Sequence, residues 1–144
     1  MNHRFVVGLA VAVVAGGLWG TALQAQQTAA VSASSGVYTA DQAKRGKAVY
    51  TESCEKCHLE DLTGGTSPPL AGNEFLSAWK GRTLGALFEQ IRMTMPFDSP
   101  GKLSAEQYAD VLAYIFSANK YPTGTIELAH DVGPLQKIQI DARK

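Results

Sequence analysis

The chain has little cysteine and no excess of charge of either sign, and both shortages narrow its possible functions. Cys54 and Cys57 are the only two cysteines among 144 residues, too few and too close together for the disulfide framework of a small secreted domain. Lys and Arg number 13, and so do Asp and Glu, which disfavours both a basic nucleic-acid-binding surface and an acidic disordered tail. The length suits about one domain of roughly 100 to 200 residues.

The chain also lacks an apolar run that spans a bilayer comfortably, since a span takes about 20 residues. Its longest apolar run, residues 5–18, follows a short basic leader and precedes small residues suited to cleavage. This three-part pattern predicts a secretory signal peptide over residues 1–25. An uncleaved membrane anchor is the alternative, and both interpretations imply export to the periplasm. Residues 26–38 are small and polar without periodicity, which predicts a flexible linker.

The most informative feature is a C-x-x-C-H motif made of Cys54, Cys57 and His58. Residues three and four positions apart share a helix face, so the two thiols and the imidazole converge. Two thiols can add to the vinyl groups of a haem while the imidazole reaches its iron, and this motif is the signature of c-type haem attachment. A zinc site would need a further distant ligand such as His130, and a thioredoxin-type dithiol would need a preceding strand. Covalent haem c is therefore the favoured interpretation.

A haem iron bound by His58 needs a sixth ligand, and a thioether raises the reduction potential and suits electron transfer. The candidates are Met93 and Met95, which follow an amphipathic segment predicted to be helical over residues 83–92. Pro96 biases the residue before it towards an extended backbone, which favours Met95 as the ligand. Met93 is then a packing residue and the fallback ligand. An open sixth position, or His130 as a second imidazole, is also compatible with the motif.

Helical periodicity predicts three main helices, over residues 39–54, 83–92 and 104–119. Thr39 suits the N-cap of the first helix, and Ser104 with Gln107 forms a capping box for the last. A glycine inside a helix is costly, so Gly46 indicates a place where another helix comes close. With no strand-rich segment, the sequence predicts a single all-α domain.

At this point the chain resembles the class I c-type cytochromes, which are monohaem proteins, over residues 39–121. Gly46 and Tyr50 are similar to the glycine and aromatic pair on the N-terminal helix of that family, and residues 104–119 are similar to its C-terminal helix. The resemblance implies a small cytochrome c fold with three main helices around one covalently bound haem. It further implies that the two helices cross at Gly46 and that Tyr50 packs against an aromatic such as Tyr114.

The resemblance also implies further haem-binding residues. In the family a proline carbonyl accepts a hydrogen bond from the haem histidine, which orients the imidazole, and Pro68 matches that proline best. Leu70, two residues later, would pack on the haem. Trp79 and Arg82 match side chains with which the family satisfies haem propionates. The alternatives are an ordinary loop proline, and a core aromatic beside a solvated arginine.

Residues 79–121 look most like bacterial cytochromes that accompany quinoprotein dehydrogenases, which implies a dehydrogenase as electron donor and a terminal oxidase or another cytochrome as acceptor. With His58 and Met95 both bound, iron has no site for substrate, so we expect a periplasmic electron carrier with no catalytic residues. A fixed haem subunit of a dehydrogenase complex and a haem gas sensor are the alternatives. The side chains that could steer an acidic partner, or simply form a solvated surface, are Lys44, Lys47, Lys56, Lys80 and Lys102.

Residues 122–144 form a C-terminal extension that departs from the minimal cytochrome pattern. Its apolar positions, within 126–129 and 135–140, are too few to form a domain. We therefore expect this extension to wrap the haem domain or to contact a partner. His130 lies in it and is expected to be neither a ligand nor a catalyst.

Overall fold

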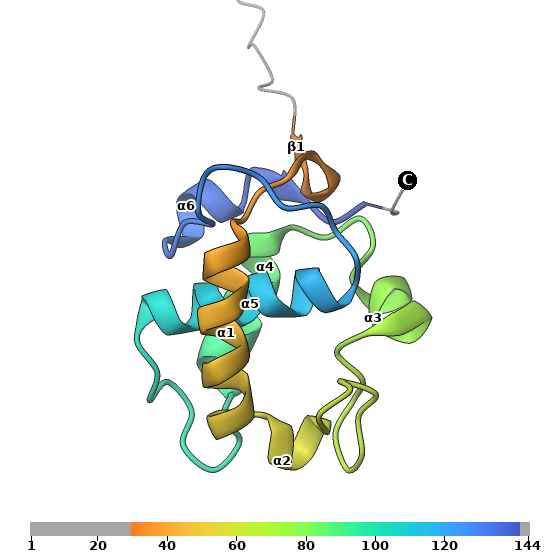
Figure 1. The fold of residues 1–144 in the computed structure, drawn as a ribbon, viewed down its shortest axis with the longest axis vertical. Helices are drawn as coiled ribbons and strands as arrows, with labels where there is room; N and C mark the ends of the chain where they lie inside the picture. The colour runs from red at the N-terminus through yellow and green to blue at the C-terminus, as the bar shows by residue number, and fades with distance from the viewer. Residues whose placement is uncertain (1–29, 142–144) are drawn as a thin grey trace, which may run out of the picture.

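The computed structural model describes residues 30–141, which are mostly helical (Figure 1). The predicted signal peptide, residues 1–25, lies outside the described residues. Within residues 30–141, no helix combines the length and the apolar character needed to cross a membrane. In chain order the elements are β1 (Val31–Ser32), the 3-10 helix η1 (Ala33–Ser35), α1 (Ala40–Ser53), α2 (Glu55–His58), α3 (Gly72–Trp79), α4 (Leu84–Thr94), α5 (Ala105–Ala118), α6 (Val132–Leu135) and β2 (Ile138–Gln139).

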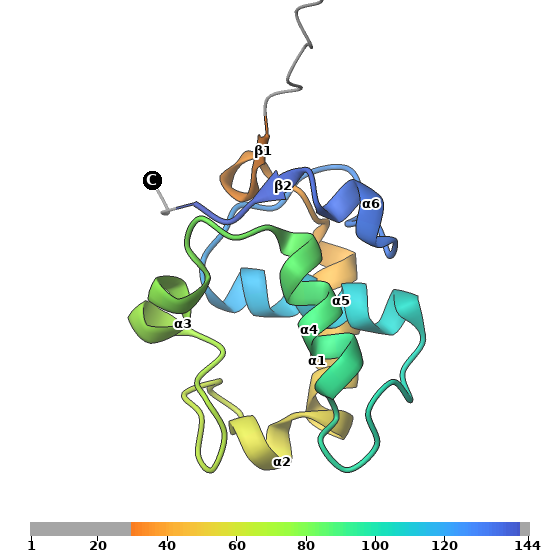
Figure 2. The ribbon, with the colours of Figure 1, turned by 180° about the vertical axis from the view of Figure 1, so that it is seen from behind.

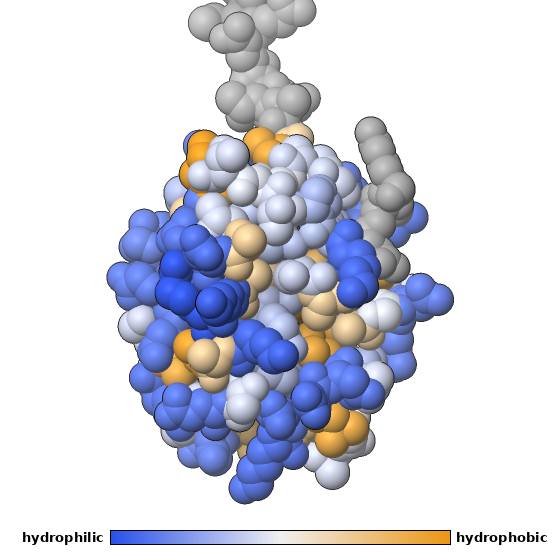
Figure 3. Space-filling model, viewed as in Figure 1, coloured by the Kyte–Doolittle hydropathy of each residue, from blue (hydrophilic) through white to orange (hydrophobic). Residues whose placement is uncertain are grey.

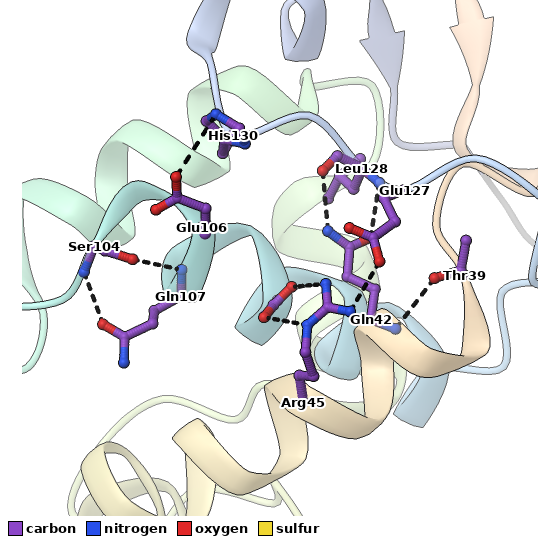
Figure 4. Close-up of polar contacts among 10 residues, drawn as sticks. Thr39, Gln42, Arg45, Ser104, Glu106, Gln107, Glu127, Leu128 and His130 are labelled. Carbon is purple, nitrogen blue, oxygen red and sulfur yellow. Dashed lines mark hydrogen bonds and ion pairs between the residues drawn. The ribbon is translucent and has the colours of Figure 1, made fainter.

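The three predicted main helices are present as α1, α4 and α5, and the all-α prediction is confirmed. Each of the three begins at a side-chain cap, worth about 1 kcal/mol of helix stability. The Oγ1 of Thr39 accepts from the Gln42 amide at 3.1 Å, and Thr83 caps α4 in the same way. Ser104 and Gln107 each accept a hydrogen bond from the backbone of the other, at 3.2 and 2.8 Å (Figure 4). The predicted capping box is therefore present.

The helices α1 and α5 cross at Gly46, with α1 in front of α5 in Figure 1, and α4 lies in front of α5 in the reverse view of Figure 2. A Cβ atom added to Gly46 would lie 1.8 Å from the carbonyl oxygen of Asp110, so only glycine permits this approach. On the next turn Tyr50 packs against Tyr114, with ring centroids 5.2 Å apart. The structure thus has both the crossing and the aromatic pair that the resemblance implies.

The helix α3 is absent from the sequence-based prediction. It buries only Phe75, and its first turn has no side-chain cap. Its start is instead fixed by Asn119 at the end of α5, whose Oδ1 accepts from the Gly72 amide at 3.0 Å and whose Nδ2 donates to the Leu70 carbonyl at 2.9 Å. Its apolar residues Phe75, Leu76 and Trp79 do have helical spacing, but eight residues are too few for that pattern to identify a helix.

Residues 31–38 correct the prediction of a flexible linker. β1 pairs in parallel with β2, with Val31 opposite Ile138, at the end of the molecule away from α2 (Figures 1 and 2). Tyr38 is buried, and its hydroxyl donates to the Tyr121 carbonyl at 2.6 Å. The order of this segment depends on residues at the opposite end of the chain, which local composition cannot reveal. The other residues of the predicted linker, 26–29, lie outside the described residues.

The C-terminal extension wraps the helical domain, which is one of the two arrangements expected from the sequence. α6 packs on α4, and both Leu135 and Ile140 are completely buried. The side-chain amide of Gln42 on α1 donates to the Leu128 carbonyl at 3.0 Å and accepts from the Leu128 amide at 2.7 Å (Figure 4). Through these two bonds the Gln42 side chain satisfies both backbone groups of Leu128 and holds the extension on α1.

A second contact between α1 and the extension is ionic. Arg45 forms a two-bond pair with the carboxylate of Asp110 on α5, at 2.9 and 3.0 Å, and its third nitrogen pairs with Glu127 at 2.9 Å (Figure 4). Hydrogen bonding to these two carboxylates raises the pKa of Arg45, and the same contact lowers the pKa of Glu127. One guanidinium thus joins two helices and the extension.

The interior is apolar, with aromatic as well as aliphatic side chains, and the surface is largely polar. On the face that shows α1, hydrophilic side chains cover the left flank, and apolar side chains emerge as separate spots (Figure 3). The helices α1, α4 and α5 contribute most of the buried side chains. The buried aromatic residues are Tyr38, Tyr50, Phe75, Phe88, Tyr108, Phe116 and Tyr121.

Candidate functional site

A cavity of about 300 Å³ is lined by side chains from the end of α1 through α5. Its walls are mostly apolar, with a few polar atoms placed among them. Seven of the eight sequence-predicted site residues line it, namely Cys54, Cys57, His58, Pro68, Leu70, Trp79 and Met95. The eighth, Arg82, lies outside the lining. The fold therefore gathers into one space residues spread over more than 40 positions of sequence.

The C-x-x-C-H motif follows α1 after a break at Cys54, and its remaining residues form the one-turn helix α2. The Cys54 amide bonds to the Tyr50 carbonyl at 2.8 Å, and the His58 amide bonds to the Cys54 carbonyl at 3.0 Å. This turn brings both thiols and the imidazole onto the cavity, as the spacing predicts. Neither cysteine forms a disulfide within residues 30–141. Burial, helped by the neighbouring Cys57, raises the pKa of Cys54 to about 11, so this thiol is protonated at neutral pH.

The imidazole of His58 is buried and held in one orientation. Its Nδ1 donates a hydrogen bond to the Pro68 carbonyl at 2.9 Å, the contact that the resemblance implies. Because a carbonyl can only accept, the proton lies on Nδ1 and the lone pair of Nε2 is left available to bind a metal. The ring is thus prepared to act as a ligand through Nε2.

The turn after His58 combines backbone strain with a distant hydrogen bond. Leu59 and Leu62 have φ values of 65° and 61°, a region that normally favours glycine and costs about 1–3 kcal/mol per residue. The hydroxyl of Tyr50 donates to the Leu59 carbonyl at 2.6 Å. Burial raises the pKa of Tyr50, which keeps this donor protonated. The sequence assigns Tyr50 to packing alone, so its role beside the motif was missed.

Met95 and Met93 have opposite environments. Met95 is the C-cap of α4 with an extended backbone, as the following Pro96 predicts, and it lines the cavity. Its amide bonds to the Ile91 carbonyl at 2.8 Å, and its carbonyl accepts from the hydroxyl of Tyr108 on α5 at 2.7 Å. Met93 is 72% exposed and lies outside the lining. The geometry therefore favours Met95 as the thioether that faces a cofactor.

Trp79 and Arg82 lie together, but they meet the cavity differently. Trp79 ends α3 and lines the cavity. The Cζ atom of Arg82 lies 4.0 Å from the centre of the Trp79 ring, a cation–π arrangement. Arg82 is exposed and, within residues 30–141, forms no ion pair. Direct contact between Arg82 and a cofactor therefore stays a prediction; the guanidinium lies outside the cavity lining and beside a ring that belongs to it.

Tyr108 on α5 and Asn119 at its C-cap both support the site. The sequence by itself assigns them only to the buried stripe and to the end of this helix. Tyr108 belongs to the buried stripe of the helix, and Asn119 marks its end, yet their side chains hold the backbones of Met95 and Leu70. Both are buried. Polar groups on the core face of a helix require partners, and that requirement is the signal that points to them.

His130 lies away from the cavity, 50% exposed, with its Nε2 atom 3.9 Å from a carboxylate oxygen of Glu106 (Figure 4). Within residues 30–141, no three side chains among His, Cys, Asp and Glu gather into a metal site. The zinc alternative therefore gains no support from the geometry.

The side chains that could bind a metal or cofactor indicate which cofactor would fit the cavity. Two thiols, an imidazole with Nε2 available and a thioether face one mostly apolar space. Thiols one helical turn apart suit covalent attachment of a haem, and imidazole with thioether suits the two axial positions of its iron. The residues present therefore fit a c-type haem.

Comparison with known proteins gives the family. No curated protein and no solved structure matches the chain. The family model described as cytochrome C oxidase, cbb3-type, subunit III matches residues 41–115, from the first turn of α1 into α5. This match contains the C-x-x-C-H motif and Met95 and spans more than half of the chain. The chain therefore belongs to this family of c-type cytochrome domains and has the small all-α cytochrome c fold.

Proposed function

We propose that the protein binds one haem c covalently through Cys54 and Cys57 and transfers single electrons. The observation that carries this proposal is the convergence of both thiols, the oriented His58 and Met95 on one apolar cavity. Family membership supports it, because this is a family of c-type cytochrome domains. The bound haem supplies a one-electron iron centre.

Each residue of the site has a distinct task. Cys54 and Cys57 would form thioethers, each S–H adding across one vinyl group, and His58 and Met95 would hold the iron. Pro68 fixes the imidazole through its carbonyl, and the Tyr108 hydroxyl fixes the backbone of Met95. Apolar walls exclude water, which helps to set the reduction potential. If His58 and Met95 both hold the iron, it would offer no site to a substrate, which favours an electron carrier over an enzyme.

Electrons would pass where the cavity reaches the surface. Phe97 lines the cavity and is also 84% exposed, so a partner can approach the cofactor closely there. We expect small, short-lived contacts with a dehydrogenase as donor and an oxidase or another cytochrome as acceptor. The N-terminal sequence pattern supports a periplasmic location. The exposed lysines that could steer an acidic partner are Lys44, Lys47, Lys56, Lys80 and Lys102.

A fixed subunit of a larger complex is the second candidate, because the matched family is described as an oxidase subunit. Size-exclusion chromatography of the native protein separates the two. A free carrier elutes at the size of one chain, whereas a fixed subunit elutes with its complex.

The proposal is tested by the haem content of the exported protein. We expect a denatured sample to retain its haem, with the mass of one chain plus one haem, and the C54S/C57S variant to retain none. As a matched control, Ser53→Ala changes a neighbouring residue that also lines the cavity and should leave the haem content unchanged. A wild-type protein without covalent haem would refute the proposal.

A further inference from the structure

The end of the chain lies along the turn that carries Arg82. We call residues 136–141 the C-terminal strap. The Gly81 amide donates to the Ile140 carbonyl at 2.7 Å, and the Ile140 amide donates to the Arg82 carbonyl at 2.8 Å. Thr83 adds a hydroxyl bond to the side chain of Gln136 at 2.6 Å. The strap therefore fixes the backbone on both sides of Arg82.

The strap is itself anchored on its other side. β1 pairs with β2, and the Val31 amide donates to the Lys137 carbonyl at 2.8 Å. The hydroxyls of Ser32 and Ser34 both donate to the carboxylate of Asp141. The Tyr121 hydroxyl donates to the Asp141 carbonyl at 2.7 Å. The strap thus lies between the N-terminal segment and the Arg82 turn, and it is not a loose end.

The guanidinium of Arg82 is a positive charge that lies against a wall of the cavity. Its guanidinium stacks on Trp79, whose ring lines the cavity, and no carboxylate within residues 30–141 pairs with it. A cation near a redox centre disfavours the oxidised form, because that form has one positive charge more than the reduced form. A guanidinium held at this place therefore raises the reduction potential.

We propose that the C-terminal strap is a positioning element that holds the Arg82 guanidinium on Trp79 at the edge of the cavity, and so sets the reduction potential of the bound haem. This inference rests on the proposed function. It assigns a role to an extension that the family match, which ends at residue 115, does not include. Removing the strap should free Arg82 and lower the potential by moving its charge away.

The test is a redox titration of four haem-loaded proteins: the full chain, Arg82→Gln, a chain ending after Gln136, and the combination. We expect either single change to lower the midpoint potential. In the shortened chain, Arg82→Gln should then lower the midpoint potential little further, because the guanidinium of Arg82 has already moved away from the cavity edge. As a control, Lys80→Gln removes an exposed charge from the same turn and should give the same small shift in both backgrounds.

Two outcomes would overturn the inference. The first is an unchanged midpoint potential in the shortened chain. The second is that shortening lowers the midpoint potential equally whether residue 82 is Arg or Gln. Because Ile140 is buried, the shortened chain can fail to fold, and Ile140→Pro then carries the same test. That change removes the donor to the Arg82 carbonyl and keeps apolar bulk. A protein without covalent haem would refute the proposed function, whereas additive shifts in a haem protein refute the positioning role alone.

Discussion

The two segments that carry the proposed iron ligands are held in different ways. Around His58 the contacts are local in sequence: Tyr50 bonds to the Leu59 carbonyl, and the imidazole bonds to Pro68. Met95 follows the end of α4, and its carbonyl is fixed by Tyr108 on another helix. The histidine is therefore positioned within one short stretch of chain, whereas the methionine depends on how α4 packs against α5. Perturbation should release the methionine first.

The largest effect is expected from Met95→Ala. Loss of the thioether leaves an open axial position, so the reduced protein should bind carbon monoxide and its midpoint potential should fall. Met93→Ala is the matched control, because Met93 is 72% exposed and its loss should change stability by less than about 0.5 kcal/mol. Absorption spectra with and without carbon monoxide make the comparison. Carbon monoxide binding in the Met93 variant alone would reverse the assignment.

A smaller effect is expected from Tyr108→Phe. It removes one of two donors to the Met95 carbonyl, which keeps the Gly101 amide at 3.3 Å, and should cost about 1.5 kcal/mol in the free energy of unfolding, measured by denaturant titration. It should also speed carbon monoxide binding, since the methionine is less firmly held. Tyr114→Phe on the same helix is the control, because the hydroxyl of Tyr114 forms no hydrogen bond within residues 30–141. Equal effects of the two changes would argue against a specific role for Tyr108.

The corresponding change on the histidine side, Tyr50→Phe, should cost less, about 1 kcal/mol. Leu59 is 44% exposed, so water can replace the lost hydroxyl at its carbonyl. The bond between His58 and Pro68 persists, and the spectrum should stay unchanged. Release of the axial histidine in this variant, seen as a high-spin spectrum, would show that the two sides do not differ as the contacts indicate.

The smallest effect is expected from a change at Asp141, where the C-terminal strap meets the N-terminal segment. Burial alone would raise the pKa of Asp141, but hydrogen bonds from Ser32 and Ser34 outweigh it and leave the pKa below its ordinary value. A lowered folded-state pKa stabilises the protein above the unfolded value of about 3.9, and this contribution is lost as the pH falls below it. Asp141→Asn should therefore lower stability at pH 7 by about 1 kcal/mol and reduce its loss between pH 5 and 3. Denaturant titrations across that range test this, and an unchanged pH dependence would contradict it.

Sequence reasoning succeeds where the signal is local. The spacing of Cys54, Cys57 and His58 follows from helix geometry, and Gly46 indicates a helix crossing because a side chain there would collide with α5. The extended backbone of Met95 follows from Pro96. These features depend on neighbours within a few residues, or on one residue type whose cost in a helix is known.

The features that were missed depend on residues distant in sequence. α3 is fixed at its start by Asn119, and β1 is ordered by β2 at the other end of the chain. Arg82 stacks on Trp79 within a turn that the strap fixes. Composition and periodicity contain no information about such partners until the fold brings them together.

The central claim is that His58 and Met95 close the coordination of a covalently bound haem. It is tested most directly by absorption spectra of the exported protein, oxidised and reduced, with carbon monoxide added to the reduced form. We expect a low-spin c-type spectrum, a near-infrared methionine-to-iron band in the oxidised protein, and no response to carbon monoxide. A high-spin spectrum or ready carbon monoxide binding would contradict it.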